Sequence, residues 1–315
     1  MERLATILLT ALAPIAWGTT YLVTTEMLPP GHPLFAGLVR ALPAGLLAVV
    51  IGGRLPRGTW WWRILVLGAL NIGAFFPLLF LAAERLPGGV AAAVAGAQPL
   101  IVLILGALVL RERIRPLSAA AAVAGAGGVA LVVLGPAARL DALGLLAALG
   151  GVTATGVGMI LTKQWGRPVG VGPIAYAGWQ LTAGGVLLLP VTLTVEGVPS
   201  TVDGAAILGY LWLGTVGGIV AYTLWFRGIQ RLPVIAPGLL ALLSPIVATT
   251  LGALVVGEAF TPTQSIGFGI AVTALVLGQI VARPERRMTT VPTRAVGTDA
   301  DLAAASRTQF LPKSF

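Results

Sequence analysis

Ten long apolar runs, separated by short breaks, divide most of this sequence. They cover residues 4–25, 34–51, 62–83, 88–110, 117–134, 142–161, 171–195, 204–226, 234–256 and 264–282. Each run is about 18–25 residues long, the length that a helix needs to cross the hydrocarbon core of a bilayer. None of them alternates apolar and polar residues as the strands of a membrane barrel do. The sequence therefore predicts an all-α integral membrane protein with ten transmembrane helices.

The composition supports a membrane protein and excludes several other classes. The chain is 57% hydrophobic and 10% charged, whereas a soluble domain is about 25% charged. It has no cysteine and one histidine, so it offers no disulfide framework and few metal ligands. The net charge of +9 would suggest nucleic acid in a soluble protein, but here the placement of the charges matters more. We expect no cofactor, no metal and no nucleic-acid partner.

The start of the first run has an alternative interpretation. A charged start followed by Ala11 and Ala13 resembles a cleaved signal peptide. The apolar run continues well past that point, and the internal repeat described below needs this helix. We therefore expect it to stay as the first transmembrane helix.

Basic residues gather in alternate breaks between the runs, and such residues accumulate on the cytoplasmic side. One side receives Arg3, Arg54, Arg57, Arg63, Arg111, Arg113, Arg115, Lys163, Arg167, Arg227, Arg231, Arg283, Arg286 and Arg287. The opposite side receives only Arg85 and Arg139. This pattern predicts a multi-pass protein of the plasma or inner membrane with both termini in the cytoplasm. Residues 284–315 are polar and aperiodic, which predicts a disordered cytoplasmic tail.

The chain also repeats itself. An offset of 146 residues carries Arg85-Leu86-Pro87 to Arg231-Leu232-Pro233, Pro99 to Pro245, and Glu112 to Glu258. Earlier in the chain an offset of 140 carries Gly18 to Gly158, Arg40 to Gln180, and Gly45 to Gly185. We therefore divide the chain into two five-helix repeats, residues 1–138 and 139–283. Because five is odd, the second repeat must enter the membrane upside down relative to the first.

Inverted repeats are typical of carriers that bind solute near the middle of the membrane, where helices are interrupted. The sequence places a matched pair of interruptions, Gln98-Pro99 and Ser244-Pro245, at the centres of the fourth and ninth runs. Proline removes a backbone N–H, so Ala95 and Ala241 should have freed carbonyls beside the polar side chains. The alternative is a structural kink that neighbouring helices satisfy.

Arg40 is a full charge within a predicted span, about 10 Å from its outer end. It has two interpretations. It attracts an anionic group of a substrate, or it pairs with Glu26 or Glu84 near the outer surface, which we favour. Its counterpart in the second repeat, Gln180, is polar but neutral.

Aromatic and amide residues within the spans complete the candidates for contact with a solute. They are Trp17, Tyr21, Asn71, Phe75, Trp179 and Tyr222. Asn71 and Phe75 are four residues apart and therefore share a helix face. A buried asparagine in lipid needs a partner, so Asn71 should face protein or solute. For any single tryptophan, packing or anchoring is the commoner role.

Several of these stretches together resemble a known family. "PIAWGTTYLVT", "LVRALPAG", "GGVAAAVAGAQPLIVLILGALVLRERI" and "LLALLSPIVATTLGALVVGEAF" resemble the EamA-type, ten-helix branch of the drug/metabolite transporter superfamily. The resemblance implies export of metabolites, often amino acids, through a cavity between helices one, three, four, six, eight and nine. Carried over by position, that cavity would be faced by Trp17, Asn71, Phe75, Gln98, Tyr222 and Ser244. The stretch "WGTTYLVTTEMLPPG" further resembles a branch associated with pigment or secondary-metabolite export.

Together these features predict a secondary transporter that exports a small polar or amphipathic metabolite by alternating access. The sequence has no phosphate-binding loop for ATP and no carboxylate in the middle of a span, so we expect movement down a gradient. Export of a pigment or drug is an alternative, as is a sensor or assembly subunit that transports nothing. An enzyme acting on lipid would need clustered acidic or histidine residues within the spans, and there are none. The oligomeric state stays open.

Overall fold

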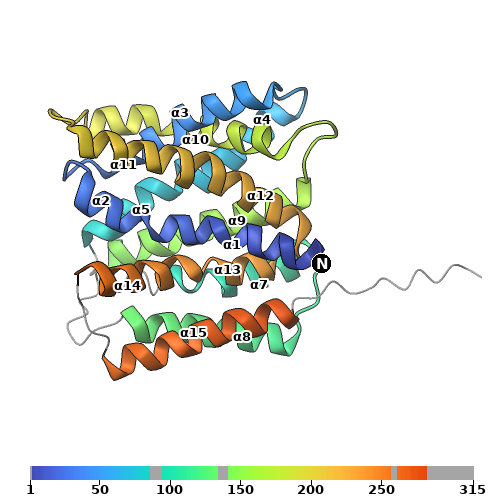
Figure 1. Ribbon diagram of the computed structural model, residues 1–315. Helices are drawn as coiled ribbons and strands as arrows, with labels where there is room; N and C mark the ends of the chain where they lie inside the picture. The colour runs from blue at the N-terminus through green and yellow to red at the C-terminus, as the bar shows by residue number, and fades with distance from the viewer. Residues whose placement is uncertain (1, 86–93, 134–140, 257–260, 282–315) are drawn as a thin grey trace, which may run out of the picture. The chain divides into compact units, whose positions relative to one another are not determined.

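The computed structural model describes residues 2–85, 94–133, 141–256 and 261–281, and all regular structure in these ranges is helical (Figure 1). Residues 1–283 form one compact unit by their contacts. The predicted disordered tail, 284–315, lies outside the described residues, as does Glu258.

The first half of the chain forms helices over the predicted runs, although the first run, 4–25, is divided between two helices. They are α1 (Glu2–Gly18), α2 (Thr20–Met27), α3 (Pro33–Gly52), α4 (Trp60–Gly68), the π-helix η1 (Ala69–Gly73), α5 (Phe75–Arg85), α7 (Gln98–Val109) and α8 (Pro116–Val133). The third predicted run, 62–83, consists of three successive helical elements, α4, η1 and α5. The fourth predicted run, 88–110, is described from residue 94 onwards.

The second half repeats this order. Its helices are α9 (Ala142–Trp165), α10 (Pro173–Val195), α11 (Gly204–Gly214), the π-helix η2 (Thr215–Val220), α12 (Ala221–Arg231), α13 (Ile235–Leu240), α14 (Leu243–Val256) and α15 (Pro262–Val281). The offsets found in the sequence recur in these bounds. Pro33 and Pro173 begin α3 and α10, and the π-helices begin at Ala69 and Thr215, 146 residues apart.

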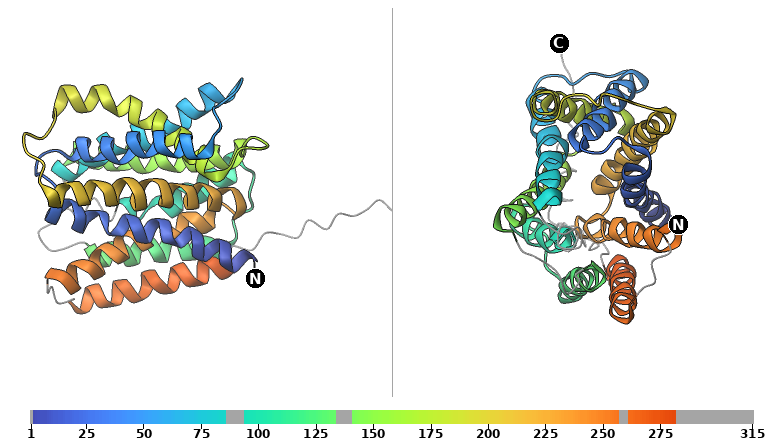
Figure 2. Two further views of the ribbon diagram at one scale, coloured as in Figure 1. Left: turned by 45° about the horizontal axis from the view of Figure 1, so that its top comes forward. Right: turned by 90° about the vertical axis from the view of Figure 1, so that its left-hand side faces the viewer.

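Helix packing follows the same relationship between the halves. α3 packs against α10 and α8 packs against α15. The two pairs lie on opposite sides of the bundle, at the top and at the bottom of Figure 1, and Figure 2 shows the same arrangement. Between them, α5 of the first half packs against α9 of the second, and α12 of the second half packs against α1 of the first. The contact of α5 with α9 is therefore matched by the contact of α12 with α1.

Glycine permits the close approach of α3 and α10. A Cβ atom added at Gly45 would collide with the backbone nitrogen of Thr182, and one added at Gly185 would lie 2.7 Å from the Cβ of Leu42. Small residues of this kind let helix backbones approach inside lipid, where van der Waals contact drives association. The equivalence of Gly45 and Gly185 in the sequence therefore reflects one shared interface.

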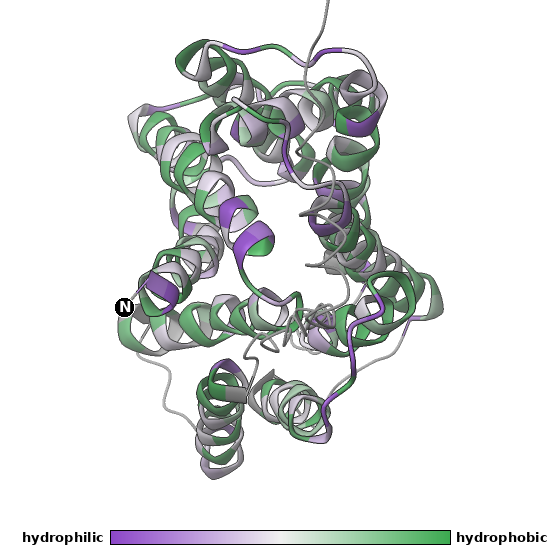
Figure 3. Ribbon diagram, turned by 90° about the vertical axis from the view of Figure 1, so that its right-hand side faces the viewer, coloured by the Kyte–Doolittle hydropathy of each residue, from purple (hydrophilic) through white to green (hydrophobic). Residues whose placement is uncertain are grey.

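The outside of the bundle is apolar, as expected for a surface that faces lipid. Leu108 and Leu254, which are 146 residues apart, are 73% and 77% exposed. Hydrophobic residues cover most helix turns in the end-on view of Figure 3. Seven described segments are long and apolar enough to cross a membrane, and three shorter apolar helices accompany them, Gln98–Val109, Pro116–Leu131 and Ile235–Ala248. The all-helical membrane architecture is thus confirmed, while the count of ten spans stays a prediction.

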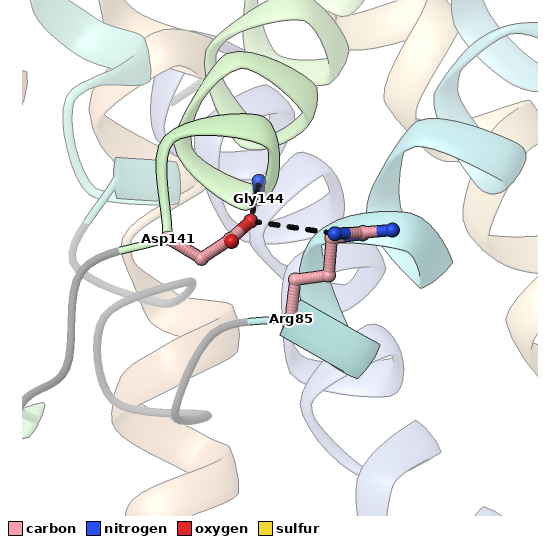
Figure 4. Close-up of polar contacts among 3 residues, drawn as sticks. All are labelled: Arg85, Asp141 and Gly144. Carbon is pink, nitrogen blue, oxygen red and sulfur yellow. Dashed lines mark hydrogen bonds and ion pairs between the residues drawn. The ribbon is translucent and has the colours of Figure 1, made fainter.

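Carboxylates at the ends of the bundle bind the starts of helices. Asp141 precedes α9 and accepts a hydrogen bond from the backbone N–H of Gly144 at 2.7 Å, while Arg85 at the end of α5 lies 3.9 Å from the same oxygen (Figure 4). Glu196, which follows α10, accepts the backbone N–H groups of Leu34 and Phe35 at 2.9 and 3.0 Å. These contacts satisfy donors that have no partner within their own helix.

Candidate functional site

Arg40 lies on α3 and is buried, with 7% of its surface exposed. Its Nη2 donates to the backbone carbonyl of Gly217 at 3.0 Å, and its Nη1 reaches the Thr20 hydroxyl at 3.4 Å. The guanidinium carbon lies 5.7 Å from the centre of the Phe76 ring and 5.9 Å from that of Tyr222. With Trp17, these residues are called the Arg40 cluster below: Trp17, Thr20, Arg40, Phe76, Gly217 and Tyr222.

The π-helix η2 supplies the carbonyl that Arg40 binds. In an α-helix the N–H of Ala221 would donate to the carbonyl of Gly217, four residues back. Here that N–H donates to the carbonyls of Val216 and Gly218 instead. The freed oxygen of Gly217 accepts the indole N–H of Trp17 at 3.0 Å as well as Arg40. Short π-helical turns of this kind are frequent at functional sites.

The Trp17 ring completes one side of the cluster. It lies 5.0 Å from the ring of Tyr222 and 5.1 Å from that of Trp225, measured between ring centres. Tyr222 is 6% exposed, whereas Trp17 is half-buried. The structure therefore brings three sequence candidates together: Trp17, Arg40 and Tyr222.

Asn71 and Gln180 form the matching contact in the other half. Asn71 lies in η1, and its side-chain nitrogen donates to the side-chain oxygen of Gln180 on α10 at 2.8 Å. By the offsets of 146 and 140, these two residues correspond to Gly217 and Arg40. One half therefore has a pair of neutral amides where the other half has a guanidinium bound to a carbonyl.

The expected ion pair of Arg40 is wrong for Glu26. Among the described side chains, no carboxylate forms an ion pair with the guanidinium. Glu26 lies on the exposed last turn of α2. The side chain of Glu84, the other expected partner, lies outside the described part of the structure. The cation is held by a carbonyl, a hydroxyl and aromatic rings.

Both proline-linked interruptions exist, but each break lies before its proline. Gln98 and Pro99 begin α7 after a turn at 96–97, and Ser244 and Pro245 lie in the first turn of α14. A proline in the first turn of a helix is well tolerated, because the N–H there has no partner within the helix. The freed carbonyl expected at Ala241 is wrong, since it accepts the backbone N–H of Ser244 at 3.1 Å.

Gln98 contacts the second half of the chain. Its side-chain nitrogen lies 3.5 Å from the Thr155 hydroxyl and 3.4 Å from the Met159 sulfur, both on α9. Ser244, its counterpart, lies near α1, because a Cβ added at Gly18 would stand 2.8 Å from the Ser244 carbonyl oxygen. Gln98 therefore lies where α7 contacts α9, and Ser244 lies where α14 contacts α1. These two contacts correspond, because each joins an interrupted helix to the first helix of the opposite half.

Phe75, Trp179 and Tyr21 take other positions. Phe75 and Asn71 both lie against α9, near Gly151 and Gly158 respectively. Trp179 is 3% exposed, and its indole N–H donates to the carbonyl of Arg54 at 2.7 Å, so it anchors the end of α3. The side chain of Tyr21 lies outside the described part of the structure.

A charged contact that the sequence did not suggest joins the ends of three helices. Lys163 on α9 donates to the carbonyls of Gln230, at 3.2 Å, and Leu232. Glu112, which follows α7, accepts the backbone N–H of Val234 and interacts with the charge of Lys163. Burial raises the pKa of the Glu112 carboxyl, and the Val234 hydrogen bond and Lys163 offset only part of that rise. The two side chains thus bind the connection between α12 and α13.

The chemistry available here is recognition by hydrogen bonds, rings and one cation. The described residues include no cluster of histidine and acidic side chains able to hold a metal ion. Their described carboxylates lie at helix ends or in connections: Glu2, Glu26, Glu112, Asp141, Glu196 and Asp203. These features suit the binding of a solute.

Comparisons with known proteins agree on the family. Protein PecM of Dickeya dadantii is 43% identical over 280 residues, which cover 89% of this chain and 94% of that protein. The uncharacterized transporter YwfM of Bacillus subtilis is 27% identical over 289 residues, covering 88% and 94%. A solved crystal structure superposes with a TM-score of 0.75 at 23% identity over 89% of this chain and 98% of that chain, which shows a shared fold.

The family model for EamA-like transporters matches this chain twice, over residues 4–134 and 142–278. The two matches together cover most of the described helices and correspond to the two halves set out above. The resemblance found in the sequence is therefore confirmed. The chain belongs to the EamA-like transporter family.

Proposed function

We propose that the chain is a secondary transporter that exports a small polar or amphipathic metabolite by alternating access between two inverted five-helix repeats. The repeats span residues 1–138 and 139–283, and both termini are cytoplasmic. The solute binds between the halves, near the Arg40 cluster, Asn71, Gln98 and Ser244. It moves down its own gradient, because the described carboxylates lie at helix ends or in connections and not in the middle of a span.

One observation carries this proposal. The contact of Arg40 with Gly217 joins α3 to η2, and the contact of Asn71 with Gln180 joins α10 to η1. The two contacts therefore occupy corresponding positions, each between a π-helix of one half and a helix of the other half. Carriers built from inverted repeats bind solute at such an interface, and polar groups buried in a membrane bundle mark the pathway. Family membership supports transport as the activity.

Inversion is tested by labelling single cysteines, which the chain makes simple because it has none of its own. Arg113→Cys and Ala259→Cys lie beside the two related glutamates, Glu112 and Glu258. We expect a membrane-impermeant maleimide to label position 259 in intact cells and position 113 only after the membrane is opened. Labelling of both from the same side would contradict the inverted repeat.

Transport is tested without assuming a solute. The medium of cells that overproduce the protein is compared by metabolomics with that of cells lacking it. We expect at least one metabolite to accumulate outside only when the protein is present. The double variant Gln98→Leu with Ser244→Ala should lower that export while the protein remains folded in the membrane. Removal of residues 286–315 should leave export intact, and it serves as the matched control.

The energy source is tested in liposomes once an exported solute is identified. Purified protein should equilibrate the solute across the membrane, and an uncoupler should leave the initial rate unchanged. A rate that collapses with the uncoupler would show proton coupling and refute the uncoupled mechanism.

A pigment or drug exporter is the second candidate, and the aromatic rings favour it. Trp17 lies about as far from Tyr222 as from Trp225, at 5.0 and 5.1 Å between ring centres. The rings meet at interplanar angles of 53° and 65°, and such a cluster of rings suits a flat, conjugated solute as well as it suits packing. The same metabolomics separates the two candidates, because a conjugated solute absorbs visible or near-ultraviolet light.

A further inference from the structure

We infer that Arg40 is a specificity-determining residue that binds the carboxylate of an aromatic or otherwise apolar organic anion. This inference rests on the proposed transport function and names the class of its solute. Three observations carry it, and they concern the free donors of the guanidinium, the rings around it and the neutral counterpart in the other half.

The guanidinium keeps donors that no residue in the described part of the structure uses. An arginine has five N–H groups, and here one on Nη2 binds Gly217 while Nη1 makes a long contact with Thr20. The Nε atom is buried and has no hydrogen-bond partner among the described residues. A carboxylate binds arginine through two parallel N–H groups, and the free Nε–H with a terminal N–H provides such a pair. Leaving a buried cation without a counter-ion is costly, and a bound anion removes that cost.

The rings beside Arg40 define the rest of the solute. Phe76 and Tyr222 lie within 6 Å of the guanidinium carbon, and Trp17 contacts Tyr222. Aromatic faces stabilise the cation and also pack against an apolar body. The expected solute therefore has a carboxylate at one end and a ring or a broad apolar part at the other.

In the opposite half the position that corresponds to Arg40 is occupied by Gln180, a neutral residue that joins two helices. There Gln180 accepts from Asn71, so a neutral amide pair is enough to join η1 to α10. The corresponding contact of η2 with α3 could be made by a neutral residue in the same way. A full positive charge at Arg40 therefore exceeds what packing requires.

A second group of cations is consistent with an anionic solute. Arg167, in the connection between α9 and α10, lies close enough to Arg231 and Arg227 for their charges to interact. Burial, followed by the repulsion from these two arginines, lowers the pKa of Arg167. Such a group attracts anions to its end of the bundle and repels cations.

The test compares four proteins in the metabolomics experiment: the wild type, Arg40→Gln, Arg40→Lys and Arg63→Gln. Arg40→Gln copies the residue at the corresponding position of the other half, so folding should tolerate it. Arg63 is the matched control, because its guanidinium carbon also lies over an aromatic ring, 5.3 Å from the centre of the Trp60 ring. Export is normalised to the amount of folded protein in the membrane.

We expect the exported solutes to be carboxylates, their export to fall at least tenfold in Arg40→Gln, and Arg40→Lys to keep part of it. Arg63→Gln should export like the wild type. Export of neutral or cationic solutes, or normal carboxylate export by folded Arg40→Gln, would overturn the inference and leave the transporter proposal standing. Export of nothing by the wild type would overturn both.

A binding measurement keeps the inference testable if Arg40→Gln does not fold. Purified wild-type protein, freed of lipid in detergent, is heated with phenylacetate, indole-3-acetate and benzoate, each beside its neutral carboxamide, and with inorganic phosphate. At least one carboxylate should raise the unfolding temperature more than its carboxamide and more than phosphate. Equal shifts within every pair, or no shift at all, would contradict a carboxylate site, and a shift from phosphate alone would assign the cation to phosphate.

Discussion

The side chain of Asn71 donates a hydrogen bond to the side-chain oxygen of Gln180 over 2.8 Å, and both residues are buried. The corresponding positions of the other half hold Gly217 and Arg40, which are joined by a bond of 3.0 Å. The two contacts tie each π-helix to a helix of the opposite half. Changes at these four residues should therefore report on the interface between the halves.

Replacing Asn71 with leucine should destabilise the protein by about 1–3 kcal/mol, because the buried oxygen of Gln180 would lose its donor. The melting temperature in detergent measures the effect. The double variant Asn71→Leu with Gln180→Leu should recover part of the loss, since no polar group would then be stranded. A double variant less stable than the sum of the two single variants would contradict this account.

Gly45→Ala should separate α3 from α10, because the added methyl group would collide with the backbone of Thr182. Overpacking of this kind costs about 1–3 kcal/mol, and here rigid backbone leaves little room for relief. The control is Gly269→Ala, whose added Cβ would meet open space. The fraction of protein that stays monodisperse in detergent after heating measures both, and equal behaviour would argue against close packing at Gly45.

The stability of the protein should depend on pH through Glu112. Burial raises the pKa of this carboxyl above its ordinary value of 4.5, so the folded state holds the proton more tightly than the unfolded state does. The penalty for ionisation is absent below the unfolded pKa and grows as the pH rises through the folded pKa.

Glu112→Gln should therefore gain stability relative to the wild type as the pH rises from about 4.5 towards neutrality. The difference between the two melting temperatures, followed across that range, checks the sign. A difference that shrinks with rising pH would mean that Lys163 and the N–H of Val234 outweigh burial.

The Asp141 carboxylate in Figure 4 makes two contacts of different kinds, a helix cap with Gly144 and an exposed ion pair with Arg85. Asp141→Ala should cost about 1 kcal/mol, because the first turn of α9 would lose its acceptor. Arg85→Ala should cost less than about 0.5 kcal/mol, since both partners are more than 40% exposed and the ions lie 3.9 Å apart. Melting temperatures measured in low and high salt distinguish them: only the smaller effect should vanish in salt.

Much of the architecture could be predicted because lipid constrains sequence strongly. The apolar runs, the offsets of 146 and 140 and the correspondence of Arg40 with Gln180 all rest on residue spacing, which the membrane and the duplication impose together. The helix bounds at Pro33 and Pro173, and those at Pro116 and Pro262, follow that spacing.

The details of the site could not be predicted, because they depend on packing between distant segments. Nothing local in the sequence marks η1 or η2 as π-helical, although the carbonyl freed at Gly217 decides where Arg40 and Trp17 bind. The contact of Lys163 with the connection after α12 joins residues that are 67 and 69 positions apart. Trp179 is a candidate by residue type, but its partner, the carbonyl of Arg54, has no signature in the sequence.

The mismatch between Arg40 and Gln180 has a consequence for how such a molecule can arise. In a symmetric dimer of identical half-length chains, any residue at this position would occur twice, on both sides of the dyad. Two guanidinium ions would then compete for one anion, or two amides would offer it no charge. In a single chain that restriction is absent, because the two positions are encoded separately, and one cation can then stand where a dimer would have to carry two or none.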